Sequence, residues 1–435
     1  MRFGRLANPW ECVGHDPFGV GRPPPVFAAL RHACRAPSPG PSPGGIPTAD
    51  ETDARRGPSA LPSAGSGPTG GTVERGAAFD AAEVVRRYDH TRLRLGMIAS
   101  HSALDLCDGA TDEGFRTVAV CEKGREKTYE RYRRIVHEVI VLDRFAEVTR
   151  PEVLEKLTSR CVIFTPNRSL TAYVPVECVE NDLRVPMFGN RRILKTDERD
   201  LQYEMFQRGG IPCPRKIDSP QKIDGPAIVK VPDARKPVER AFFTCSSVQD
   251  FHAKVERRVE QGLLRREDVA KAWIEEYVVG ALFNFNFFYS PLNDRLEFLG
   301  LDRRIQTNID GFLKLPARDQ LDLPIETKNE EVGHESVTIR ESLLEGVFEL
   351  GERLVEVARK MYPPGIIGPF ALQGSVKPHK EIVIFDFSPR MPGSPVLYSS
   401  PYSKYFFGKA VTSGRRVAME IKEAAEQNRL AEVVS

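Results

Sequence analysis

Between residues 92 and 165, short apolar runs alternate with segments in which apolar residues recur every three or four positions. The apolar runs predict buried strands, and the periodic segments predict helices joined by short loops. Strands are expected at 92–100, 117–121, 138–142 and 162–165, and helices at 103–113, 127–135 and 151–158. Strand–helix alternation of this kind is typical of a parallel, doubly wound sheet.

Two polar residues follow strands of this predicted sheet. His101 comes after the first strand and Ser169 after the fourth. Ligands of doubly wound sheets bind at the carboxyl ends of the strands, so both positions suit a ligand. A loop-capping or solvated role would also account for a lone His or Ser, and the pattern leaves both readings open.

From residue 211 onward the organisation changes to strands in a meander with helices between them. Strands are expected at 225–232, 240–247 and 272–280, a hairpin at 281–304, and helices at 196–208, 248–262, within 336–361 and at 410–427. Asn308 and Asp310 before Gly311 predict a turn. Residues 316–335 and 388–404 are polar or rich in Pro, Gly and Ser, which predicts loops.

Residues 366–390 have two apolar arms around a Lys-Pro-His-Lys turn, which is the pattern of a β-hairpin. Each arm carries one oxygen-bearing side chain where an apolar residue is expected, Gln373 in the first and Asp386 in the second. Such positions can face each other across an antiparallel pair. An amide and a carboxylate on one face can hold a hard cation such as Mg²⁺ while phosphates complete its shell. An amphipathic hairpin with two solvent-facing polar residues explains the same pattern.

Several charged residues stand where their surroundings demand a partner. Lys230 interrupts an apolar strand and must reach solvent or an anion, because an unpaired buried ammonium is costly. The adjacent Arg191 and Arg192 form either a phosphate clamp or a solvated face. Glu275 and Glu276 lie in a strand-like stretch and could accept hydrogen bonds from an adenine amine and ribose hydroxyls, or lie on a solvated edge strand.

The first 76 residues differ in composition from all that follow. They are dense in Pro, Gly and Ser and have no hydrophobic period, so they predict a disordered extension. A wrongly assigned upstream start codon would produce the same pattern.

Bulk composition places the chain as a whole among ordinary globular proteins. Of its 435 residues, 41% are hydrophobic and 28% charged, and 62 basic against 60 acidic residues leave a net charge of +2. No global field favours nucleic acid, and no apolar run approaches the length of a membrane span. The eight cysteines are scattered without CxxC pairs, which predicts reduced thiols in a cytoplasmic protein.

Seven strings, in order, carry a resemblance to a known family. They are ASHSALDLCDGATDEGF, VPMFGNRRIL, AWIEEYVVG, FFYSPLND, NIDGF, IRESLLEGVFELGERL and PPGIIGPFALQ. Together they resemble the archaeal FAICAR synthetases, the formate-dependent ATP-grasp ligases of purine synthesis, over residues 92–433. Seven strings in one order are far more specific than a single short motif.

The resemblance implies an α/β fold with a Rossmann-like N-terminal (pre-ATP-grasp) domain at 77–185 and a two-lobed ATP-grasp domain at 186–435. It implies a ligase that formylates the 5-amino group of AICAR with formate and ATP, through formyl phosphate. The cofactors would be ATP and Mg²⁺ or Mn²⁺, the partners small molecules, and the protein would form a homo-oligomer if it follows the family.

The resemblance also assigns roles to individual residues. His101, Ser169 and Asn308 would contact AICAR, and Lys230 would meet ATP phosphates. The adenine hinge would be Glu275, Glu276, Tyr277 and Val278, with Gln373 and Asp386 binding the metal. Arg191, Arg192 and Arg390 resemble phosphate or formate ligands.

Three departures from the family pattern leave alternatives open. Asp386 stands where the family usually has Glu. The glycine-rich phosphate loop is replaced by residues 232–240, where Arg235 could supply side-chain charge instead of backbone donors. A Gly-Gly-Thr-Asn stretch is replaced by residues 392–395. An ATP-grasp ligase for another acid and amine, or a non-catalytic nucleotide-binding paralogue, is therefore an alternative.

Overall fold

The computed structural model describes residues 79–232, 240–323, 325, 331–393 and 400–435. The predicted disordered extension, Arg235 and most of the altered phosphate loop lie outside the described residues, as do positions 394 and 395. Within the described ranges, no helix is both long enough and apolar enough to cross a membrane.

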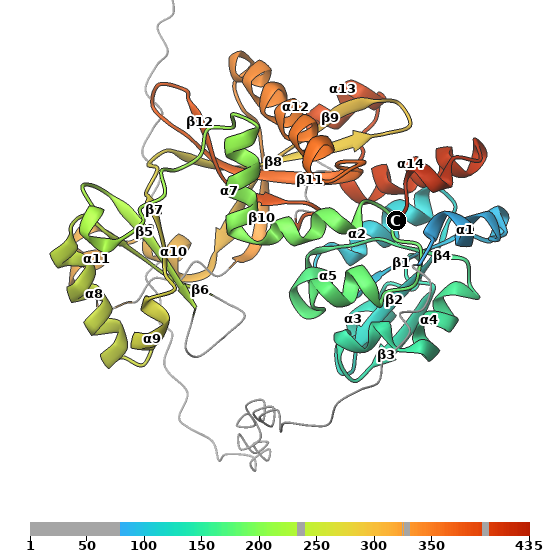
Figure 1. Cartoon of the computed structure of the whole chain (residues 1–435), viewed down its shortest axis with the longest axis horizontal. Helices are drawn as coiled ribbons and strands as arrows, with labels where there is room; N and C mark the ends of the chain where they lie inside the picture. The colour runs from blue at the N-terminus through green and yellow to red at the C-terminus, as the bar shows by residue number, and fades with distance from the viewer. Residues whose placement is uncertain (1–78, 233–239, 324, 326–330, 394–399) are drawn as a thin grey trace, which may run out of the picture. The chain divides into compact units, whose positions relative to one another are not determined.

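The first part of the described chain forms a parallel four-stranded sheet in the order β3-β2-β1-β4 (Figure 1). Its strands are β1 (Arg94–Ile98), β2 (Arg116–Glu122), β3 (Glu138–Leu142) and β4 (Val162–Phe164). The helices around it are α1 (Ala81–Arg86), α2 (Ala103–Asp112), α3 (Glu126–Arg131), α4 (Pro151–Thr158), α5 (Arg168–Tyr173) and α6 (Val176–Asn181). The predicted strand–helix alternation is confirmed; β1, β2 and β4 are buried over most of their length, whereas the edge strand β3 is only partly buried.

A five-stranded antiparallel sheet follows in the order β10-β9-β8-β11-β12. Its strands are β8 (Ala281–Ser290), β9 (Arg295–Gln306), β10 (Glu331–Val337), β11 (Gly368–Val376) and β12 (Ile382–Ser388). The helices α7 (Arg199–Arg208) and α12 (Leu344–Met361) contribute to the core beside this sheet, where Leu354 packs among phenylalanines of the strands. Both predicted hairpins, at 281–304 and 366–390, are confirmed.

A smaller antiparallel sheet, β6-β5-β7, has its own core with α8. It consists of β5 (Ala227–Pro232), β6 (Arg240–Cys245) and β7 (Trp273–Glu276), with α8 (Val248–Glu260) and α9 (Arg266–Val269). Helix α8 begins after Ser247, whose hydroxyl accepts a hydrogen bond from the amide of Asp250 at 3.1 Å.

Three loop predictions are wrong in part. The expected turn at Asn308 is helix α10 (Thr307–Phe312), and the expected loop at 316–335 contains α11 (Ala317–Asp322) and strand β10. The expected loop at 388–404 runs into α13 (Pro401–Phe407). Strand β10 has almost no apolar residues, so its pairing with β9 is specified by tertiary contacts instead of a local pattern.

The last helix, α14 (Ser413–Glu426), packs against α2 in the core of the parallel sheet. Two glycines allow the close approach: a Cβ at Gly109 would lie 2.2 Å from the Arg415 amide nitrogen, and one at Gly414 would lie 2.4 Å from the Asp105 carbonyl oxygen. The end of the chain continues along the same part of the molecule, where the Ser435 amide donates to the Met187 carbonyl at 2.9 Å.

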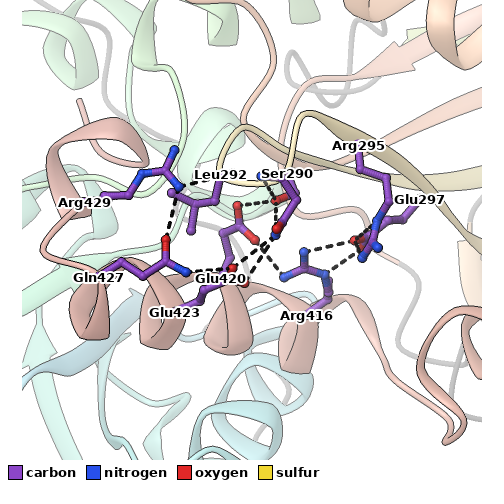
Figure 2. Close-up of polar contacts among 10 residues, drawn as sticks. Ser290, Leu292, Arg295, Glu297, Arg416, Glu420, Glu423, Gln427 and Arg429 are labelled. Atoms are coloured by element: carbon purple, nitrogen blue, oxygen red, sulfur yellow. Dashed lines mark hydrogen bonds and ion pairs between the residues drawn. The ribbon is translucent and has the colours of Figure 1, made fainter.

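A buried charge cluster ties α14 to the antiparallel sheet (Figure 2). The Arg416 guanidinium donates to both carboxylate oxygens of Glu297, at 2.6 and 3.1 Å, and lies 2.9 Å from Glu420. It also lies over the Phe288 ring, 4.2 Å from the centroid. All three charged side chains are at most 2% exposed, so their charges are stabilised by one another rather than by water.

We predict that Arg416→Met lowers the free energy of unfolding by about 3–5 kcal/mol, because it leaves Glu297 and Glu420 buried without this cation. Lys360→Ala is the control: its ion pair with Glu356 is exposed on a helix and is worth about 0.3–0.5 kcal/mol. Denaturant unfolding measures both. A loss below about 1 kcal/mol for Arg416→Met would show that the buried Glu297 and Glu420 do not depend on this cation.

Candidate functional site

The hairpin of β11 and β12 brings Gln373 and Asp386 opposite each other, as the sequence predicted. The amide nitrogen of Gln373 donates to Asp386 Oδ2 at 2.7 Å. The register shifts directly after this pair, since Gln373 faces Asp386 whereas Gly374 faces Ile384. Phe385 is thus the extra residue of a β-bulge, a feature that re-aims side chains in many active sites.

The pair is the centre of a polar row that crosses the sheet. In the strand register Gln373 lies beside Asn284 on β8, and Asn284 lies beside Asp302 on β9. Asn284 and Asn286 donate to the two carboxylate oxygens of Asp302, at 2.6 and 2.7 Å. Asn284 and Asn286, two positions apart on β8, therefore share one carboxylate.

The donor set at Gln373 and Asp386 fits a hard cation. It offers one carboxylate and one amide, whose oxygen and nitrogen are distinguished only by hydrogen bonding. In the described part of the chain no three or more His, Cys, Asp or Glu side chains group as a metal site. A site with only one or two protein ligands is common for Mg²⁺, because waters and substrate phosphates complete its coordination shell.

Lys230 finds its anion in Glu275, on the neighbouring strand β7. The Lys230 ammonium forms an ion pair with Glu275 Oε1, and both side chains are at most 6% exposed. Tyr203 donates to Glu275 Oε2 at 2.8 Å, and the Trp273 indole donates to the same oxygen. Arg199 lies 3.8 Å from that oxygen. Both oxygens of this buried carboxylate therefore have a donor.

The environment of Lys230 connects it electrostatically to the metal hairpin. Burial lowers the pKa of Lys230 most, Arg199 lowers it further, and Glu275 and Asp386 oppose them, leaving a pKa of about 8. Arg199 also donates to the carbonyl oxygen of Phe385 at 3.1 Å, at the bulge. Lys230, Arg199 and Asp386 thus belong to one charged neighbourhood.

The predicted adenine hinge, residues 275–278, comprises the last two residues of β7 and the two that follow. The amide of Glu276 donates to the Arg215 carbonyl and that of Tyr277 to the Pro226 carbonyl, each at 2.9 Å. The Tyr277 side chain is 43% exposed, and Val278 is half-buried. The hinge backbone is therefore held in place by two neighbouring loops.

The two adjacent arginines separate in the structure. The buried Arg191 guanidinium donates to the carbonyl oxygens of Val179, Leu183, Val185 and Ser435. Arg192 is exposed. The interpretation of a paired phosphate clamp is replaced for Arg191 by a structural role: its guanidinium fixes the end of the chain against the loop after α6.

Arg390, directly after β12, is 5% exposed and donates to both carboxylate oxygens of Asp197, at 3.2 and 3.1 Å. It lines a small cavity together with Thr165 and Asn190. Within the described residues, Arg390 Nε and Thr165 Oγ1 have no hydrogen-bond partner. A small anion would satisfy both donors.

His101 and Ser169 lie at the carboxyl edge of the parallel sheet. The Asn167 amide donates to the carbonyl oxygens of Ile98, Ser100 and His101, at 2.8 to 3.1 Å, and so shapes the loop after β1. Ser169 is buried, and its hydroxyl has no hydrogen-bond partner among the described residues. Asn308 is half-buried in α10.

Sequence reasoning missed Asp302, His334 and Glu331. His334 on β10 lies 2.6 Å from Asp302 and 2.7 Å from Glu331, through its two ring nitrogens. Burial acts to lower the pKa of His334, but the hydrogen bonds to Asp302 and Glu331 outweigh it and raise the pKa to about 9. The two amides on β8 were the available signal, because buried amide donors need an acceptor.

Two family models match the chain, a protein of unknown function (DUF1246) over residues 95–217 and a domain of unknown function (DUF1297) over residues 250–435. The chain is 42% identical over 366 residues to a 5-formaminoimidazole-4-carboxamide-1-(beta)-D-ribofuranosyl 5'-monophosphate synthetase of Methanothermobacter thermautotrophicus, covering 83% of this chain and 99% of that protein. The synthetase of the same name from Methanocaldococcus jannaschii is 40% identical, with 81% and 98% covered.

Solved structures agree with these relatives. The IMP biosynthesis protein PurP from Thermococcus kodakaraensis superposes with a TM-score of 0.59 at 27% identity, over 78% of this chain and all of that one. The biotin carboxylase domain of the 2-oxoglutarate carboxylase from Hydrogenobacter thermophilus, solved with MgADP and bicarbonate, has a TM-score of 0.50 at 11% identity, over 75% and 69%. The second likeness concerns the fold alone.

We predict that His334 stays protonated through neutral pH and titrates near pH 9, whereas His101 titrates below its ordinary range, because burial chiefly lowers the pKa of His101. Imidazole ¹⁵N signals measure both. Because the folded-state pKa of His334 is raised, its contribution to stability is complete below about pH 6.5 and is lost as the pH rises through about 9.

Asp302→Asn should lower the pKa of His334, since it removes one of the two carboxylates that hold the proton. Glu335→Gln is the control on the same strand, where Glu335 makes only an exposed pair with Arg303. A His334 that titrates at its ordinary value in the wild type would contradict the assignment.

Proposed function

The chain belongs to the family of 5-formaminoimidazole-4-carboxamide-1-(beta)-D-ribofuranosyl 5'-monophosphate (FAICAR) synthetases, and on this premise we propose how its residues act. Membership confirms the predicted resemblance and the α/β fold of the ATP-grasp type. The protein is accordingly a ligase of purine biosynthesis that formylates the amine of AICAR. ATP and formate are the proposed co-substrates, and the cytoplasm is the proposed compartment.

ATP is proposed to bind between the small sheet and the five-stranded sheet. Residues 275–278 would hold the adenine. Lys230 and Asp386 would lie on the same side of the phosphates. Gln373 and Asp386 would hold Mg²⁺ or Mn²⁺, which when bound neutralises phosphate charge and orients the phosphates. The charged neighbourhood of Lys230, Arg199 and Asp386 supports this placement.

AICAR is proposed to bind at the carboxyl edge of the parallel sheet. His101, Ser169 and Asn308 would contact it, and the unpartnered hydroxyl of buried Ser169 is available as a donor. Formate would bind beside Arg390, where Arg390 Nε and Thr165 Oγ1 offer two donors to a small anion. Arg192 is exposed and could meet a phosphate, whereas Arg191 has only the structural role described above.

The chemistry needs positioning and charge stabilisation rather than a protein nucleophile. A formate oxygen attacks the γ-phosphorus of ATP to give formyl phosphate and ADP, and the AICAR amine then displaces phosphate from the formyl carbon. Charge develops on the phosphoryl oxygens in the first step, so fixed cations accelerate it. Lys230, Arg199 and Arg390 are held in place by carboxylates or carbonyl oxygens, so they need little reorganisation during reaction.

One observation carries the proposal: the register places Gln373 opposite Asp386. Asp386 also interacts electrostatically with Lys230 and with Arg390. The replacement of the family's Glu by Asp386 keeps a carboxylate at this position. The altered loop at 233–239 lies outside the described residues, so the proposal does not depend on it.

We expect the purified protein to make FAICAR only when ATP, formate and AICAR are all present. Mass spectrometry identifies the product, and [¹³C]formate should appear in it as one added carbon. ADP release that depends on a different acid would show that the protein is a ligase for another acid. Binding of ATP without turnover under any of these conditions would favour a nucleotide-binding paralogue.

Asp386→Ala should reduce Mg²⁺-dependent turnover by roughly 10²–10³-fold, because a group that stabilises transition-state charge is lost. Glu381→Ala is the matched control at the start of the same hairpin arm, where Glu381 pairs only with exposed Lys377. Circular dichroism checks folding, and Mg²⁺ titration checks whether the deficit is metal-linked. Full activity of folded Asp386→Ala would exclude the metal assignment.

A further inference from the structure

Three titratable side chains at one end of the polar row have no part in the proposed chemistry. They form a hydrogen-bonded line from Asp302 on β9 through His334 to Glu331 on β10. The side chains are 0%, 7% and 30% exposed in that order. The line therefore runs from the interior of the sheet to its surface, and only its last member reaches solvent.

Glu331 lies where two loops of the candidate site meet. The loop after β1 and the loop after β12 are joined by Ser102, whose hydroxyl donates to the Pro392 carbonyl at 2.7 Å. A Cβ at Gly393 would lie 3.8 Å from Glu331 Oε1. His101 interacts electrostatically with Glu331, and also with Arg168 and Arg390. The Glu331 carboxylate thus faces the same space as the residues proposed to contact AICAR.

The reaction requires a proton acceptor, and Glu331 is a carboxylate with no other part in the proposed chemistry. An aromatic amine that attacks a formyl carbon must lose one N–H proton before the amide is complete. Lys230 and Arg390 are ion-paired cations, and Asp386 is committed to the metal in the proposal. A general base must lie within hydrogen-bond reach of the proton, and its carboxylate must be kept ionised.

We propose that Glu331 accepts the proton of the attacking 5-amino group, and that His334, held by Asp302, is a positioning residue that orients Glu331. The inference rests on the proposed function and deepens it. The amine nitrogen bonds to the formyl carbon while its proton moves to Glu331. The carbon–oxygen bond to phosphate breaks, the electron pair leaves with phosphate, and Glu331 returns the proton to that phosphate.

A purely structural role for the line makes a different prediction. Glu331 also pairs with Arg304 at 2.9 Å, so it could simply brace the edge strand β10. In that case its removal would slow the whole reaction evenly or loosen the fold. A proton acceptor acts only in the second step, after formyl phosphate and ADP have formed. The two roles therefore separate when ADP and FAICAR are measured side by side.

The test compares Glu331→Gln with Glu335→Gln, the exposed position four residues along the same strand. Glu331→Gln should lower FAICAR formation by roughly 100-fold or more, the usual contribution of a general base. Formate-dependent ADP release should fall much less, because formyl phosphate then hydrolyses in water. Glu335→Gln should leave the ratio of ADP to FAICAR at the wild-type value.

The pH profile supplies the second readout. The groups that face Glu331 are His334 on its own strand, Arg304 on β9 and His101 after β1, and those that face His334 include Asp302. His334 and Arg304 act to lower the pKa of Glu331 against the effect of burial. His334→Gln should therefore shift the acid limb of the pH–rate profile to higher pH. Glu331→Asp should leave the acid limb at the wild-type pH.

The outcomes separate the two levels of the proposal. If the wild-type enzyme makes no FAICAR, the proposed function fails. If it does, but folded Glu331→Gln keeps FAICAR formation within threefold and the wild-type ADP ratio, the inference fails. Should Glu331→Gln not fold, Glu331→Asp and His334→Gln decide: an unshifted acid limb in His334→Gln overturns the inference, and a shifted one supports it.

Discussion

The register of strand β11 is the constraint on which the site depends. Its position between β12 and β8 places Gln373 beside Asp386 on one side and beside Asn284 on the other. A slip of one residue would turn Gln373 to the opposite face and separate the candidate metal pair from the amides. Apolar neighbours on the other face, such as Leu372, hold the register through the core with α12.

Several buried charges that connect elements of the structure have an opposite charge beside them. Lys230 pairs with Glu275 in the small sheet, and Arg390 pairs with Asp197, which lies just before α7. Such pairs add little net stability, because desolvation offsets the attraction, but removing one partner is costly. The partners also fix the positions of these cations, which suits a site that binds anions.

The residues proposed for the two steps of the reaction lie on different elements, and the same loops connect these elements. The groups proposed to bind ATP and its phosphates lie on the strands β5, β7 and β12, whereas His101 and Ser169, which are proposed to contact AICAR, follow β1 and β4. The segment after β12 reaches from one set to the other, because the Met391 amide donates to the Pro166 carbonyl at 3.2 Å. Helix α14 and the buried Arg416 hold the parallel sheet to the antiparallel one, which stabilises this arrangement (Figure 2).

The sequence by itself determined the local elements and the faces of the hairpins. Alternating apolar residues place Gln373 and Asp386 on one side of their strands, and the seven matching strings identify the family. Only the tertiary structure decided which partners the polar groups take. Arg191 is buried against carbonyl oxygens while Arg192 is exposed, and Glu275 turns to Lys230. The physical reason is that side-chain direction follows from the local backbone period, whereas strand pairing, burial and the partner of a charge depend on residues far apart in the chain.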